Sequence, residues 1–213
     1  YNRSNLEVKL KDALFLVHPK ANTSEQQAVF DKIVSGNLQT PYTWETQLSE
    51  LGQKQFASKE EKETAAKALW EELIDSGRLG YMALLRNLRN ILQTNVSASH
   101  VEKVASHISD PAKVAKSKQL PFRFLAAYKE LVDVTSVHTA AILSALEKAV
   151  KESVVNLEGF GADTNVLVAA DVSGSMFSTI SFKSSVMNYD IGILLSMLLK
   201  SKCSSVISGM FGD

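Results

Sequence analysis

The sequence predicts a mainly α protein, in which an α-solenoid of about nine short helices is followed by a truncated α/β domain. Apolar residues recur at helical spacing from Leu6 to Gly159. The two glycines of Gly159-Phe-Gly161 then mark a boundary, and an apolar strand, helix and strand follow it. We therefore expect a helical-repeat domain over residues 1–160 and an incomplete α/β domain over 161–213.

The composition limits the classes of function only weakly. Lys plus Arg and Asp plus Glu number 23 each, so any basic surface must be local. The single cysteine, Cys203, cannot form an intrachain disulfide, and we expect a buried structural thiol in a cytoplasmic protein. Neither a signal peptide nor an apolar run of about 18 residues is visible, so the sequence predicts no membrane association.

Capping and stop signals delimit the helices of the first third of the chain. Pro19 ends the first helix, which begins at Leu6, and Ser24 is expected to cap the second. Thr43 begins the third, and Ser58 with Glu61 forms a capping box for the fourth. Glycines end the second, third and fourth helices, at Gly36, Gly52 and Gly77.

The remaining helices are read in the same way. The helix from Met82 to Leu92 has an apolar face made of Leu84, Leu85, Leu88, Ile91 and Leu92. Asp110-Pro111 combines an N-cap with proline at the first helical position. Further helices are expected from Ser97 or Ser99 to Ile108, from Phe122 to Val132 and from Ala140 to Leu157.

After the glycines the pattern indicates a parallel strand–helix–strand unit. The predicted elements are a strand over Val166–Ala170, a helix over Tyr189–Lys200 and a strand over Ser205–Met210. Two strands and one helix cannot bury a core of their own, so we expect this domain to be incomplete at Asp213.

Three oxygen-bearing side chains stand just past the first of these strands. Asp171, Ser173 and Ser175 alternate along the loop, at the edge where open α/β sheets bind ligands. A carboxylate with two hydroxyls suits Mg²⁺ or another hard divalent cation. The alternative is an ordinary turn, because Asp, Ser and Gly also form turns.

Basic residues gather in two places among the helices. Arg86 and Arg89 are three residues apart and share one helix face. The densest basic run consists of Lys113, Lys116, Lys118 and Arg123. Either set can bind RNA phosphates or can simply form a solvated helix face. The side chains of His100, His107, His138, Trp44 and Trp70 are expected to be structural.

Five motifs, in this order, resemble the TROVE-domain family, which includes the Ro autoantigen and bacterial Ro-like proteins. Four lie in the helical part, and the fifth resembles the metal-ion-dependent adhesion site of von Willebrand factor A domains. They are Leu10–Leu14 with Val17-His18-Pro19-Lys20, Met82–Leu88, Leu120-Pro-Phe-Arg123, Ile142–Ala149 and Asp171-x-Ser173-x-Ser175.

The resemblance implies a ring of HEAT-like helical repeats closed by a von Willebrand A domain. Family members bind Y RNAs and the single-stranded ends of misfolded RNAs, act in RNA quality control beside exoribonucleases, and are not nucleases. The family ring has further helices before the first motif. Its A domain completes the metal site with Thr- and Asp-bearing loops, which would lie beyond Asp213.

These observations lead to a primary hypothesis and two alternatives. The first is a non-enzymatic RNA-binding protein whose contacts are Lys11, His18, Lys20, Arg86, Arg89, Lys116, Lys118 and Arg123. The second is a metal-dependent protein-interaction module, which would recruit an exoribonuclease or another protein through Asp171, Ser173 and Ser175. The third is a metal-dependent enzyme, for which the sequence places no general base.

Overall fold

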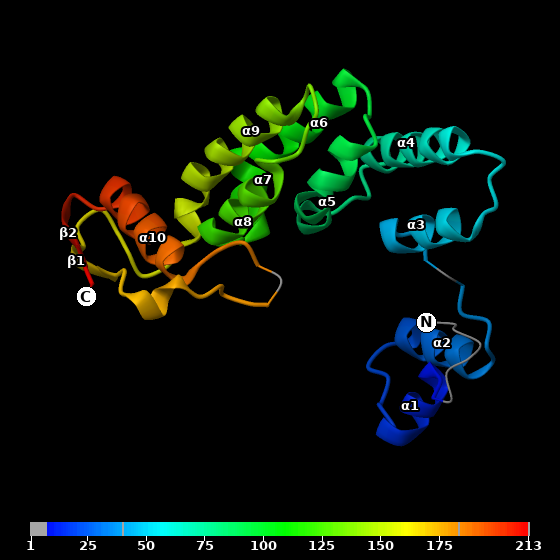
Figure 1. Ribbon diagram of the computed structural model, residues 1–213. Coiled ribbons are helices and arrows are strands. Elements are labelled where there is room, and N and C mark those ends of the chain that lie inside the picture. Colours follow the sequence, from blue (N-terminus) through cyan, green and yellow to red (C-terminus); the bar gives the residue numbers. More distant parts are fainter. Residues whose placement is uncertain (1–7, 40, 183, 213) are drawn as a thin grey trace. The chain divides into compact units, whose positions relative to one another are not determined.

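The computed structural model describes residues 8–39, 41–182 and 184–212. Within these ranges it contains ten α-helices and two β-strands (Figure 1). The mainly helical fold with a small α/β part is confirmed. The chain forms two compact units, Tyr1–Thr46 and Gln47–Asp213, each of which is described by itself. The predicted boundary between residues 160 and 161 falls inside the second unit and stays a prediction, as does the HEAT-like character of the helices.

The first unit is built on two short helices, α1 (Leu10–Val17) and α2 (Ser24–Val34). The expected cap of α2 at Ser24 is wrong by one residue. Thr23 is the cap, because its Oγ1 accepts a hydrogen bond from the Gln26 amide at 3.2 Å. Gly36 follows α2 with a φ of 72°, as expected for a helix stop. The predicted start at Leu6 lies outside the described residues.

The helices from the unit boundary onward follow the predicted order. They are α3 (Trp44–Gln53), α4 (Lys59–Asp75), α5 (Tyr81–Gln93), α6 (Ala98–Ser109), α7 (Pro111–Ser117), α8 (Pro121–Leu131) and α9 (Thr139–Glu152). The predicted caps at Ser58 and Asp110 are confirmed, since their side-chain oxygens accept from the amides of Glu61 and Lys113. The predicted stop at Gly52 is wrong, because α3 continues to Gln53.

The last of these helices ends earlier than the sequence predicts. Instead of continuing to Leu157, α9 stops at Glu152, and a 3₁₀ turn covers Ser153–Asn156. The Ser153 hydroxyl donates to the Val150 carbonyl at 2.7 Å, and such a bond competes with the backbone pattern of an α-helix.

The core of the second unit forms where α6 and α8 pack on α9 and where α5 packs against α6 and α8. All five leucines and isoleucines predicted to face inward on α5 are buried. The core also contains Phe124 of α8, Leu146 of α9 and Trp70 of α4, each at most 1% exposed. Trp44, expected in a core, is only half-buried.

The predicted strand–helix–strand unit is present as β1 (Asn165–Asp171), α10 (Asn188–Lys202) and β2 (Ser205–Phe211). The strands are parallel, in a register that runs from Asn165 opposite Ser205 to Asp171 opposite Phe211. Figure 1 shows α10 beside this two-stranded sheet, and it contacts both strands. Cys203, at the end of α10, is buried, as expected for a structural thiol.

Two polar links tie α10 to the helices before it. At its start, Asp190 accepts from the Met187 amide at 2.8 Å and also pairs with Lys129 of α8. At its end, the Lys202 ammonium donates to the carbonyl oxygens of Val154 and Leu157, at 3.1 and 2.6 Å. Because α8 and α10 are linked in this way, the segment that enters α10 is held beside α8. No helix within the described ranges has both the length and the hydropathy that a membrane span needs.

The hydroxyl of Tyr81 joins the start of α5 to the end of α6, since it donates to the Ile108 carbonyl at 2.7 Å. Burial and the nearby Asp110 carboxylate raise the pKa of Tyr81, so the hydroxyl remains a donor. We expect Tyr81→Phe to lower the free energy of unfolding by about 1 kcal/mol, as measured by urea denaturation.

Tyr128→Phe is the matched control, because its hydroxyl makes a longer, exposed bond of 3.4 Å to Glu147. We expect its cost to stay below about 0.5 kcal/mol. Equal losses in the two variants would contradict the role given to Tyr81.

Candidate nucleic-acid interface

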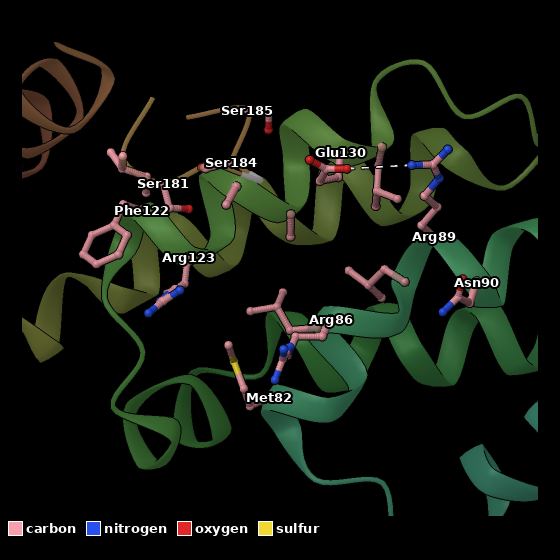
Figure 2. A pocket seen from close by; sticks show the side chains of 16 residues that line it. Met82, Arg86, Arg89, Asn90, Phe122, Arg123, Glu130, Ser181, Ser184 and Ser185 are labelled. Atoms are coloured by element: carbon pink, nitrogen blue, oxygen red, sulfur yellow. Dashed lines mark ion pairs between the residues drawn. The ribbon is translucent and has the colours of Figure 1, made fainter. Parts of the chain in front are cut away.

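A groove of about 670 Å³ lies between α5, α8 and the segment that leads into α10 (Figure 2). Its polar lining contains three arginines and one glutamate, so the described lining has a net formal charge of +2. The polar and aromatic lining residues are Arg86, Arg89, Asn90, Phe122, Arg123, Glu130, Ser181, Ser184 and Ser185. The groove thus combines positive charge, hydroxyls and one aromatic ring.

One wall of the groove is the exposed face of α5. Arg86, Arg89 and Asn90 are exposed and stand at positions i, i+3 and i+4, on the same side of the helix. The opposite face is fixed by burial, since Leu84 and Leu88 are 4% and 2% exposed. Packing of the apolar face therefore turns both arginines toward the groove.

The facing wall belongs to α8. The Arg123 guanidinium lies 5.5 Å from the centre of the Phe122 ring, within the range of a cation–π contact. Further along α8, Glu130 lies 3.9 Å from Arg89, and both side chains are about half exposed. Arg86 and Arg123 form no salt bridge with any residue that the structure describes. Their charges are therefore available to an anionic ligand.

The third wall comes from the chain between β1 and α10. It contributes Ile180, Ser181, Ser184 and Ser185. The Ile180 amide donates to the carbonyl oxygen of Val186, whose side chain is fully buried. The contact of this segment with the helical part could not be predicted, because its serines and single glycine indicate only a loop.

The structure brings together three of the predicted RNA contacts, Arg86, Arg89 and Arg123, in the lining of this groove. Lys116 and Lys118 lie on and just after α7, exposed and outside the groove lining. Lys11, His18 and Lys20 are exposed in the first unit. The RNA-binding roles of all eight residues stay predictions.

Lys113, the remaining lysine of the basic run, also lies outside the groove lining and next to His107. Lys113 Nζ lies 3.3 Å from His107 Nδ1. Burial and the charge of Lys113 lower the pKa of His107, so its imidazole is neutral at pH 7. The structural role expected for His107 agrees with its ring contact to Tyr81, whose centroid is 5.8 Å away.

Sequence reasoning missed Asn90, Phe122 and Glu130 as members of the groove. Asn90 could have been found, because it stands four residues after Arg86 on the same helix face. Phe122 directly precedes Arg123, and an aromatic residue beside an arginine is a useful signal for RNA binding. Glu130 could not have been found, because only the packing of α8 against α5 brings it to Arg89.

The second candidate site lies at the carboxyl end of β1. Ser173 Oγ and Ser175 Oγ are 3.2 Å apart, and the Ser173 amide donates to Asp171 Oδ1 at 2.9 Å. Hydrogen bonds from the side chain and backbone of Ser173 lower the pKa of Asp171, which favours its carboxylate form.

The two serine hydroxyls are spaced like neighbouring ligands of a divalent cation. Neighbouring oxygens around an octahedral Mg²⁺ ion are about 3.0 Å apart, because Mg–O bonds are about 2.1 Å long. The separation of the two hydroxyl oxygens, 3.2 Å, is close to that value. Among the described residues, no group of three or more His, Cys, Asp or Glu side chains could hold a metal ion.

Comparison with known proteins places most of the helical part in one family. The TROVE domain matches residues 17–156. The telomerase protein component 1 of Rattus norvegicus is 44% identical over 94 residues, and that of Mus musculus is 43% identical over 94 residues. Each match covers 44% of this chain and 3% of the relative's length, so the chain resembles only a small part of those proteins.

A solved structure supports the fold. The crystal structure of the Deinococcus radiodurans RO (RSR) protein matches with a TM-score of 0.60 and 23% identity. The match covers 94% of this chain and 46% of that chain. The assignment of the residues after the TROVE match to a von Willebrand A domain stays a prediction. Because the TROVE domain spans residues 17–156, well over half of the 213 residues, the chain belongs to the TROVE-domain family.

Proposed function

We propose that this protein binds RNA, and that the groove between α5 and α8 receives a single-stranded segment. The observation that carries the proposal is that Arg86, Arg89 and Arg123 line one groove together with Phe122. Membership of the TROVE-domain family and the resemblance to Ro-like proteins support it.

The groove offers the three kinds of contact that unpaired RNA uses. The guanidinium groups of Arg86 and Arg123 are unpaired among the described residues and suit phosphate oxygens. The ring of Phe122 offers a face on which a base can stack. Hydroxyls of Ser181 and Ser185, which are exposed, can bond phosphate oxygens or ribose hydroxyls. These contacts support binding rather than catalysis.

We extend the proposal to small structured noncoding RNAs and misfolded RNAs that carry a single-stranded end, in RNA quality control. A groove that contacts phosphates and stacks bases favours a flexible single strand over a rigid duplex. An RNA hairpin with a single-stranded 3′ tail should therefore bind more tightly than the same hairpin with a blunt end. Equal affinities for the two hairpins would argue against this ligand class.

The first test removes charge from the groove. We expect Arg86→Gln and Arg123→Gln each to weaken binding of a single-stranded RNA roughly five- to tenfold at low salt. Each should also reduce the slope of log K against log salt by about 0.7, because one phosphate contact is lost. Fluorescence anisotropy across a series of KCl concentrations measures both quantities.

Two further variants make this test specific. Glu130→Gln should strengthen binding, because it removes the negative charge of the groove and releases Arg89. Lys148→Gln, on the exposed side of α9 and outside the groove lining, should leave affinity and slope unchanged. If Lys148→Gln and Arg86→Gln had equal effects, the charge of the whole surface rather than the groove would bind the RNA.

A second function is favoured by the oxygen cluster at the end of β1. We propose that Asp171, Ser173 and Ser175 contribute to a divalent-cation site through which a protein partner, such as an exoribonuclease, is bound. A cation there would offer an open coordination position to a carboxylate of the partner. The side chains of this chain would hold the ion from one side, with Asp171 ionised by its bonds to Ser173.

The test of this site is the direct binding of Mn²⁺. Binding is detected through the effect of the ion on the relaxation of water protons. Asp171→Ala should abolish binding, whereas EDTA should leave RNA binding unchanged. Because hydrogen bonds from Ser173 lower the pKa of Asp171, Mn²⁺ binding should persist below the usual pKa of an aspartate. Binding should be lost as the pH falls through the lowered value. Unchanged Mn²⁺ binding in Asp171→Ala would eliminate the site.

A further inference from the structure

Two asparagines on α5 form a pair that the core does not require. Asn87 is buried, only 3% exposed, between leucines that pack inward, and Asn90 is exposed in the groove lining. Asparagine is a poor residue for a helix interior, and a buried amide is costly unless its hydrogen bonds are made. An apolar residue at position 87 would pack among the leucines without this cost, so the pair calls for an explanation.

The hydrogen bonds of the pair determine how the Asn90 amide is turned. The Ala83 carbonyl can only accept, so it must face Asn87 Nδ2, which lies 2.8 Å away. Asn87 Oδ1 therefore points toward Asn90. Because this oxygen can only accept, Asn90 donates to it from Nδ2, at 3.0 Å. The orientation of the exposed amide is therefore set by a backbone carbonyl, through a buried side chain that cannot exchange its partner for water.

The fixed amide has unused hydrogen-bonding groups. It donates one N–H to Asn87, and no other bond of the Asn90 side chain occurs among the described residues. One N–H and the carbonyl oxygen Oδ1 remain, side by side, on a residue that lines the groove. A carboxamide with adjacent donor and acceptor is the group that pairs with adenine, accepting from its amino group and donating to a ring nitrogen.

Asn90 and the aromatic ring of Phe122 lie at different places in the groove, so they would contact different nucleotides. Figure 2 shows Asn90 near Arg89, at the other end of the groove from Phe122 and Arg123. A single strand in the groove would thus stack one nucleotide near Phe122 and present another to Asn90. The arginines contact phosphates, which are the same in every sequence, so the amide is the group that can distinguish bases.

We propose that Asn90 is a base-reading residue that selects an unpaired adenine, and that Asn87 is the buried positioning residue that orients it. This inference rests on the proposed function and adds a sequence preference to it. An adenine whose edge is paired in a duplex could not reach the amide, so the preference applies to single-stranded RNA.

The experiment compares two RNAs of about 12 nucleotides, oligoadenosine and the same length of purine riboside, which lacks only the 6-amino group. Affinities of the full chain are measured by fluorescence anisotropy at low salt. We expect oligoadenosine to bind the wild-type chain at least about fivefold more tightly. Asn90→Ala should reduce this ratio to about one, and the exposed position of Asn90 makes the variant safe for folding.

Three further variants distinguish base recognition by Asn90 from the effect of the groove charge and from a loss of folded structure. Arg86→Gln should weaken the binding of both RNAs and leave the ratio of the two affinities unchanged, because it removes a phosphate contact. Gln93→Ala, an exposed amide on α5 outside the groove lining, should change neither affinity nor ratio. Asn87→Ala should lower the ratio while affinity for the purine riboside RNA stays within about twofold, which loss of structure would not produce.

The outcomes for this inference and for RNA binding are distinct. The base-reading role of Asn90 would be overturned if the wild-type chain bound the two RNAs equally well. It would also be overturned if Asn90→Ala kept the wild-type preference for oligoadenosine. Neither outcome would contradict RNA binding by the groove. Failure of the wild-type chain to bind either RNA at low salt would overturn the proposed function itself.

Discussion

Burial of the apolar face of α5 is the constraint on which the candidate interface depends. Leu84, Leu85, Leu88, Ile91 and Leu92 occupy one side of the helix and are each at most 4% exposed. Losing such a contact by truncation to alanine typically costs about 2–5 kcal/mol, far more than any exposed arginine contributes to stability. The rotation of α5 is therefore set by its core, and the direction of Arg86, Arg89 and Asn90 follows from that rotation.

This constraint explains which parts of the structure were predictable. Helical periodicity identified the inward residues of α5, and caps such as Ser58 and Asp110 act within four residues of themselves, so they were readable. The parallel strand pair was predictable because β1 and β2 are short apolar runs separated by one apolar helix. In each case the signal that predicted the element is a local or periodic pattern in the sequence.

The groove required contacts between residues distant in sequence. Arg89 and Glu130 meet only because α5 packs beside α8, and the serines near residue 181 join them because Lys129 and Asp190 link α8 to α10. Of the densest basic run, only Arg123 lines the groove, and Lys113, Lys116 and Lys118 lie outside its lining. Local charge density was thus a weaker guide than the geometry of facing helices. A chain with no net charge can still concentrate positive charge where two helices meet.

The two candidate sites share one segment of chain, which affects how substitutions in it should be interpreted. Asp171, Ser173 and Ser175 precede the groove serines by only a few residues, and Asn188 Nδ2 donates to Ser178 Oγ at 2.9 Å, between the two sites. A substitution at Asp171 can therefore disturb the groove wall through the backbone alone. A loss of RNA affinity in such a variant would not establish a role for a cation, since the wall itself would have moved. Removal of the cation by a chelator leaves the chain intact, and so it separates the contribution of the ion from that of the segment.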